Sequence, residues 1–126
     1  MASEHSVLRQ LAQLPDHLLN DLVDIFKALS DPTRAQLIYL LTRREYSVSE
    51  LSDQVPVSAS AVSHHLAKLR AIRLVQTRRD GNLVFYRIDD DDHVANLFRE
   101  ALFHLEHIHE HVGGLPIAEE STPGIP

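Results

Sequence analysis

Apolar residues recur at the spacing of an α-helix in two segments near the start of the chain. The first segment runs from His17 to Leu29, and the second follows Pro32 and continues to Arg44. Asp31 stands directly before this proline. Because aspartate is a favoured N-cap and proline a favoured first helical residue, the pair predicts where the second helix begins.

Two shorter helices are predicted next. Ser47 and Glu50 have the spacing of a capping box, which predicts a third helix that ends at Pro56. Ser58 or Ser60 can cap a fourth helix that reaches about residue 72. The apolar positions of this fourth helix recur at helical spacing and are Val62, Leu66 and Leu69.

Two β-type runs follow, over residues 74–78 and 83–88. Asp80-Gly81-Asn82 lies between them and is typical of a hairpin turn. A tight turn at Val55-Pro56-Val57 separates the third and fourth helices. The pattern predicts a mainly α fold in which a helix-turn-helix is followed by a β-hairpin wing, which is the winged-helix arrangement.

A last helix is predicted over about residues 90–111, and Gly113-Gly114 ends it. The segment beyond is rich in proline, serine and glutamate, which is typical of disorder. We therefore expect a flexible N-terminal arm (1–15), a winged-helix DNA-binding and dimerisation domain (16–112) and a disordered tail (113–126).

The composition fits a single globular domain of 126 residues. There is no cysteine, which excludes disulfides and metal sites built from thiolates. No apolar run approaches the roughly 20 residues of a membrane span. The first residues lack the basic and apolar regions of a signal peptide. A cytoplasmic protein with no membrane partner is expected.

The net charge of −6 argues against a general affinity for nucleic acid, but the charges are unevenly distributed. From Lys68 to Arg87 there are six basic residues and one acid, Asp80. Such a stripe can bind phosphate while the rest of the surface repels it. A solvated basic face without a ligand is the alternative.

Short polar side chains gather at the start of the fourth predicted helix, where a recognition helix enters the major groove. Hydroxyl and imidazole groups can bind phosphates and base edges, and arginines at the hairpin tip can reach phosphate or the minor groove. Alternatively, the serines are only caps and the histidines are partly buried. The predicted contacts with double-stranded operator DNA are Ser58, Ser60, Ser63, His64, His65, Lys68, Arg78 and Arg79.

Five of the nine histidines fall between His93 and His111, on the last predicted helix. His104 and His107 are three residues apart, so they share one helical face. At the start of the helix, a non-helical Asp91 can turn toward His93. These two pairs predict a metal site whose ligands are Asp91, His93, His104 and His107.

One chain alone cannot bring these four ligands together. His93 and His104 are 11 residues apart, which is about 16 Å along a helix, whereas each ligand must lie about 2 Å from the ion. Two copies of the helix packed antiparallel about a two-fold axis would place Asp91 and His93 of one subunit against His104 and His107 of the other. The site therefore predicts a homodimer, joined through the N- and C-terminal helices.

One aspartate and three histidines suit a tetrahedral Zn(II) ion, and Co(II) can follow it. Ni(II) usually takes five or six ligands, and His109, His111 and His5 are the predicted extra donors for that case. A site within one chain, made of His104, His107 and His111, is a rival. An exposed histidine-rich helix with no ligand role is the alternative to any metal site.

These features resemble the ArsR/SmtB family of metal-responsive transcriptional repressors, from about Leu18 to His107. The similar segments are FKALSDPTRAQLIYLL, VSELSDQVPVSASAVSHHLAKLRAIRLVQTRRDGNLVFYRI and the D-x-H…H-x-x-H pattern of the last helix. The resemblance implies an inter-subunit zinc site at that pattern and control of metal-efflux or metal-sequestration genes. Residues 45–49 (EYSVS) lack the cysteines of the thiolate sensors in this family, and Ala59 stands where relatives often have a polar residue.

The sequence thus predicts a repressor, and not an enzyme, that binds a palindromic operator as an apo dimer and releases it when Zn(II), or else Co(II) or Ni(II), binds. Metal would fix His104, whose second ring nitrogen would bond the backbone near Arg73. A metal-independent regulator and a metal store are alternatives. A hydrolase is disfavoured because four protein ligands leave no position for water.

Overall fold

The computed structural model describes residues 4–112, and side chains from Val7 to Glu110. The predicted disordered tail and the side chains of His5 and His111 lie outside the described residues. The elements in chain order are α1 (Glu4–Gln10), α2 (Asp16–Leu29), α3 (Pro32–Leu41), β1 (Tyr46–Ser47), α4 (Val48–Gln54), α5 (Ala59–Ala71), β2 (Gln76–Asp80), β3 (Leu83–Arg87) and α6 (His93–Val112).

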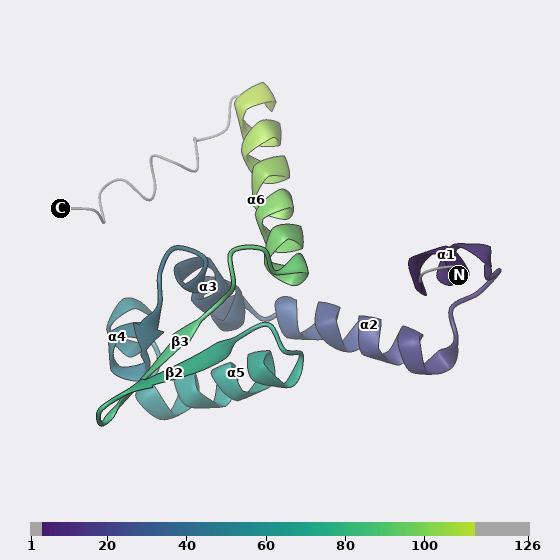
Figure 1. Ribbon diagram of the computed structural model, residues 1–126. Helices are drawn as coiled ribbons and strands as arrows, with labels where there is room; N and C mark the ends of the chain where they lie inside the picture. The colour runs from purple at the N-terminus through teal and green to yellow at the C-terminus, as the bar shows by residue number, and fades with distance from the viewer. Residues whose placement is uncertain (1–3, 113–126) are drawn as a thin grey trace.

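Helices α3, α4 and α5 and a small antiparallel sheet form the body of the molecule (Figure 1). The strand order is β1-β3-β2, so β3 lies in the middle and β2 and β3 form the wing. Side chains from all three helices are fully buried in the core, among them Leu37, Ile38, Leu51, Leu66 and Leu69. The predicted winged helix-turn-helix is confirmed.

Polar caps begin the three helices of the body where the sequence places them. The Asp31 carboxylate accepts a hydrogen bond of 2.9 Å from the backbone N–H of Arg34 at the start of α3. Ser47 and Glu50 form a reciprocal capping box at α4, with bonds of 2.9 and 3.1 Å. Ser58 caps α5. These caps fix where the helix-turn-helix begins and turns.

The end of α5 turns the chain sharply into the wing. Arg73 has a φ of 62°, in the left-handed region that costs free energy for a residue with a Cβ atom. Its N–H donates to the carbonyl of Arg70 at 2.9 Å, and the N–H of Leu74 donates to the carbonyl of Leu69 at 3.1 Å. This is the bond pair of a Schellman motif. Because Leu74 closes the helix, β2 begins at Gln76, two residues later than predicted.

The wing is a two-residue hairpin. Asp80 pairs with Leu83, which leaves only Gly81 and Asn82 in the loop. Gly81 has a φ of +62°, as the first loop residue of a type II′ turn requires. The hairpin signal in the sequence is therefore confirmed.

Two short elements were not predicted. Strand β1 has only two residues, too few to show a period, and pairs with β3 through Tyr46 opposite Tyr86 and Ser47 opposite Phe85. Helix α1 falls in the segment expected to be a flexible arm. The pairing of β1 matters because it attaches the wing to the segment just before α4.

Helices α2 and α6 extend away from the body in different directions (Figure 1). Both helices expose large apolar side chains, and Phe103 is 65% exposed. On the two helices these residues are Leu19, Leu22, Val23, Phe26, Leu97, Phe103, Leu105 and Ile108. Apolar groups concentrated on two projecting helices indicate an interaction surface. None of the described helices is long and apolar enough to cross a lipid bilayer.

Candidate metal half-sites and DNA interface

The first half-site lies at the beginning of α6. The Asp92 carboxylate accepts a hydrogen bond of 2.9 Å from the N–H of Ala95, so it caps the helix, which begins at His93 rather than near Asp90. Asp91 therefore lies in a turn just outside the helix, so its side chain need not point about 200° away from that of His93, as regular helix geometry would require. Asp91 and His93 are both exposed. This non-helical Asp91 is what the predicted pairing with His93 requires.

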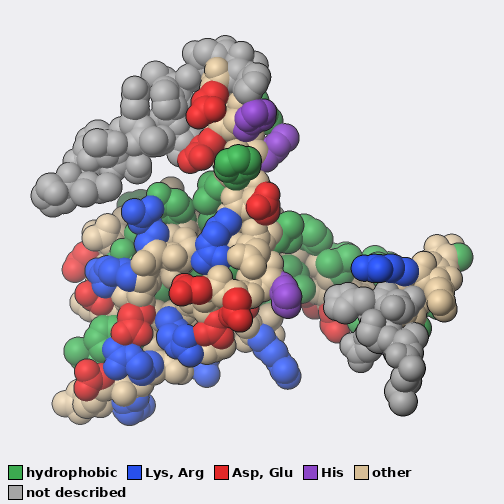
Figure 2. Space-filling model, turned by 45° about the horizontal axis from the view of Figure 1, so that its top comes forward, with side chains coloured by type: hydrophobic (Ala, Val, Ile, Leu, Met, Phe, Trp, Pro, Cys, Tyr) green, Lys and Arg blue, Asp and Glu red, His purple; other side chains and the backbone are tan. Residues whose placement is uncertain are grey.

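The second half-site lies further along the same helix. His104 and His107 are exposed and three positions apart on α6, which places them on neighbouring turns of one face. Histidine side chains gather along this helix in Figure 2. Among the predicted extra donors, His109 is half-buried on α6, whereas the side chains of His5 and His111 lie outside the described residues.

The two half-sites do not form one site within the described chain. Continuous helix from His93 to His104 separates them by about 16 Å. Among the described residues, no three His, Cys, Asp or Glu side chains form a group that could hold a metal ion. A site using all four predicted ligands therefore needs a second copy of α6. The rival site with His111 falls partly outside the described residues.

The chemistry of the donors fits a divalent ion. The side chains of Asp91, His93 and His104 make no hydrogen bond or ion pair within the described part of the chain, so no intramolecular contact competes for their donor atoms. One carboxylate and imidazole nitrogens are ligands that Zn(II) accepts. Asp91 with His93, and His104 with His107, are the residues that would hold it.

The start of α5 presents an exposed polar surface. The Ser58 hydroxyl accepts from the N–H of Ala61 at 3.2 Å and lies 3.1 Å from the Ser60 hydroxyl. Ser63 and His64 follow on the exposed side of the helix. The capping alternative is therefore true of Ser58, while Ser60, Ser63 and His64 remain accessible to a nucleic acid.

His65 lies on a different side of α5. Its Nδ1 is 3.2 Å from Nη1 of Arg34 and 3.8 Å from the Asp31 carboxylate, and its side chain is only 18% exposed. Arg34 also donates to the carbonyl of Ala28 at 2.8 Å. The backbone bond from Arg34 and the charges beside it hold the pKa of Asp31 below its ordinary value. The structure thus places His65 in the packing of α5 against α3.

The two arginines of β2 have different surroundings. Arg78 forms an ion pair with Glu45, where its Nε lies 3.2 Å from a carboxylate oxygen, and its guanidinium lies 4.8 Å from the centre of the Phe85 ring. Hydrogen bonds from Arg78 hold the pKa of Glu45 below its ordinary value. Arg79 has no such partner among the described residues.

A basic groove between α2, α3 and α5 was not found from the sequence. Lys27 and Lys68 line it together with Arg34 and a single acid, Asp24. Lys68 was predicted as a DNA contact, but Lys27 was not, since it stands alone in an otherwise acidic and apolar segment. Only the packing of α2 against the body brings the two lysines together.

Residues 31–77 match the model of the arsR family of bacterial regulatory proteins. The chain is 46% identical to the HTH-type transcriptional regulator KmtR of Mycobacterium tuberculosis, over 81% of this chain and 83% of that protein. It is 40% identical to a transcriptional repressor SmtB homolog of Synechocystis, over 79% of this chain and 78% of that protein. The chain belongs to the ArsR family.

Solved structures agree with this assignment. A homodimeric winged helix-turn-helix DNA-binding domain from Mycobacterium bovis matches with a TM-score of 0.68 and 30% identity, over 80% of this chain and 96% of that one. HlyU from Vibrio cholerae matches with a TM-score of 0.63 and 35% identity, over 72% of this chain and 97% of that one. This ArsR-family chain is therefore a DNA-binding transcriptional regulator and not an enzyme.

Proposed function

We propose that this chain is a metal-responsive repressor that binds operator DNA as an apo homodimer and releases it when Zn(II) binds between the subunits. The observation that carries the proposal is the placement of two exposed candidate ligand pairs, one at the start of a projecting helix and the other about three turns further along it. Such pairs complete a four-ligand set only when two antiparallel copies of α6 meet. Co(II) or Ni(II) would take the same ligands, Ni(II) with help from His109.

The exposed apolar side chains of α2 and α6 support the dimer. A second copy packed against these helices would cover Phe26 and Phe103, which are 51% and 65% exposed. The similar winged helix-turn-helix domain from Mycobacterium bovis is a homodimer. Zinc, when bound, would link the two copies of α6. The apolar contacts of α2 and α6 would hold the dimer together both with and without zinc.

DNA is bound by α5 and the wing in this proposal. Ser60, Ser63 and His64 would read the major groove, and Arg79 with Lys68 would contact phosphates. The positive groove beside Lys68 supports phosphate contact at that end of α5.

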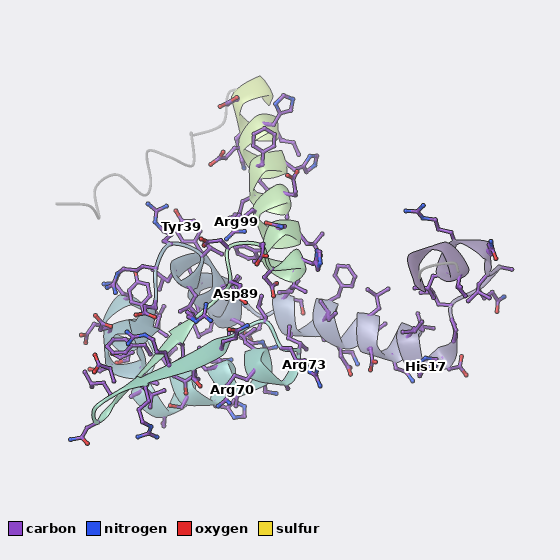
Figure 3. The ribbon with its side chains drawn as sticks, viewed as in Figure 1. His17, Tyr39, Arg70, Arg73, Asp89 and Arg99 are labelled. Atoms are coloured by element: carbon purple, nitrogen blue, oxygen red, sulfur yellow. The ribbon has the colours of Figure 1, made fainter. Side chains whose placement is uncertain are left out.

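The proposed hydrogen bond from the second ring nitrogen of His104 would reach the backbone near Arg73, which lies at the end of α5 beside α2 (Figure 3).

The test is operator affinity with and without Zn(II), for wild type and for His104→Ala. Wild type should lose about 5- to 150-fold in affinity when zinc is added, as expected for a coupling of about 1–3 kcal/mol. The variant should bind the operator normally and ignore zinc. His64→Ala serves as the matched control, since it should weaken DNA binding while leaving zinc affinity unchanged. Equal operator affinity of wild type in both conditions would reject metal control and favour a metal-independent regulator.

A further inference from the structure

Three polar side chains close a hydrogen-bonded cluster where the wing meets the loop before α6. Gln76 of β2 donates to the Asp89 carboxylate at 2.8 Å, and Arg87 of β3 donates to the amide oxygen of Gln76 at 2.8 Å. Arg87 also forms an ion pair with Asp89. Gln76 and Arg87 face each other across the two strands. Figure 3 shows Asp89 between the wing and α6. We call these residues the Asp89 cluster.

The loop that follows is fixed to α6 as well. The N–H of Asp92 donates to the carbonyl of Asp89 at 3.1 Å, and the Asp92 side chain caps α6. Arg99 reaches back from the second turn of α6 and donates to the carbonyl of Asp90 at 3.3 Å. Asp91 thus lies in a loop that is held by the wing at one end and by α6 at the other.

The Asp89 cluster contributes little to stability for its size. The side chains of Arg87 and Asp89 are 43% and 37% exposed, and ion pairs at such sites are usually worth under about 1 kcal/mol. Its geometric effect is larger, because it fixes both wing strands to the residue two positions before Asp91. Coupling between sites travels through contacts of this kind when they have alternative arrangements.

We propose that the Asp89 cluster is the link through which occupancy of the half-site at Asp91 and His93 changes the position of the wing. The inference rests on the proposed metal response and adds the residues that transmit it. Asp89, Arg87 and Gln76 are positioning residues and touch neither the ion nor the DNA. A ligand constraint on Asp91 moves the loop, and the cluster passes that movement to β2 and β3.

The test compares Asp89→Ala with Asp90→Ala. Both variants remove one carboxylate beside Asp91, but the Asp90 side chain makes no hydrogen bond or ion pair in the described chain. Gln76→Ala breaks the link to β2 without any change of charge. Urea unfolding identifies any variant that loses stability. Gln76→Ala lies on a strand remote in sequence from the predicted ligands, so the test stays decisive even if Asp89→Ala fails to fold.

We expect all three variants to bind zinc within about threefold of wild type. Zinc should weaken operator binding at least about fivefold in wild type and Asp90→Ala, but less than about threefold in Asp89→Ala and Gln76→Ala. A second readout needs no DNA. A spin label at Asn82→Cys, in a chain without cysteine, should report a zinc-dependent change in the distance between the two wing tips that both cluster variants lose.

The outcomes separate the two proposals. If wild type responds to zinc and the cluster variants respond equally, in operator binding and in wing distance, the link is overturned and the metal response stands. If wild type itself ignores zinc, the proposed function falls and the link falls with it. Loss of the response in Asp90→Ala to the same degree as in Asp89→Ala also overturns the link, since charge alone would then explain the effect.

Discussion

Neighbouring residues of the same type have different roles in this protein because their contacts differ. Arg78 is held by Glu45 and the Phe85 ring, whereas Arg79 on the next position has no partner among the described residues. Likewise His64 is exposed on α5, while His65 packs against Arg34. Composition and spacing predict such pairs as equals, and only the fold distinguishes the free member from the held one.

The ion pair at the base of the wing gives a prediction about acid stability. The pKa of Glu45 is lowered by its hydrogen bonds with Arg78. A carboxyl whose folded pKa is lowered stabilises the fold above its unfolded pKa of about 4.3, and this contribution is lost as the pH falls toward the folded value. Glu45→Gln should therefore make the loss of stability below about pH 5 less steep, measured by urea unfolding between pH 7 and 3.

The matched variant removes the other partner. Arg78→Gln leaves Glu45 in place but without the hydrogen bonds that lower its pKa, so it should flatten the acid dependence to a similar degree. If Glu45→Gln keeps the wild-type steepness, the ion pair does not contribute to acid stability in solution.

At the scale of elements, the wing and α6 each combine a scaffold with a few exposed groups. Gly81 specifies the turn of the wing, and the capping residues Asp31 and Ser47 specify where α3 and α4 begin. Such local signals are read from the sequence because they depend on neighbours within a few residues. Strand β1 cannot be predicted in this way, because it forms only by pairing with β3, about 40 residues further along the chain.

The different surroundings of Arg78 and Arg79 predict that the two arginines contribute differently to DNA binding. Each phosphate contact contributes close to one unit to the slope of log affinity against log salt concentration. Arg79→Ala should therefore weaken operator binding and reduce this slope by about 1 per subunit. Arg78→Ala should weaken binding through the position of the wing and leave the slope unchanged. Fluorescence anisotropy over a range of salt concentrations measures both the operator affinity and its salt slope. If Arg78→Ala reduces the slope as much as Arg79→Ala, Arg78 is a phosphate contact, as the sequence predicts.

At the scale of the whole molecule, the two proposed ligand pairs cannot complete a metal site without a partner. A cluster of three or more metal-ligating side chains is missing from the described residues, while α2 and α6 expose their apolar faces. The same helix therefore combines dimerisation and metal binding in the proposed function. Regulation would then depend on how two chains are arranged, and not on a pocket within one.

This arrangement predicts complementation between two inactive variants. One chain carries Asp91→Ala with His93→Ala, and the other carries His104→Ala with His107→Ala. Each homodimer should lose high-affinity zinc binding, because both of its sites lack one ligand pair. A mixed dimer has one intact site, so refolding the two chains together should restore up to one zinc per mixed dimer, measured by Co(II) spectra and calorimetry. No recovery on mixing would exclude a site shared between subunits.

The sequence by itself determined the helix-turn-helix, the hairpin wing and the positions of the proposed ligand pairs, at the start of α6 and further along it. These follow from local periodicity, caps and turn residues, and the rise per residue of a helix sufficed to show that the pairs cannot meet in one chain. Tertiary structure decided which polar side chains remain free. The packing of α3 against α5 holds His65, the pairing of β1 with β3 places Glu45 beside Arg78, and the return of the chain after β3 brings Asp89 to Gln76. These contacts join residues 13 to 33 positions apart, so no local pattern in the sequence contains them.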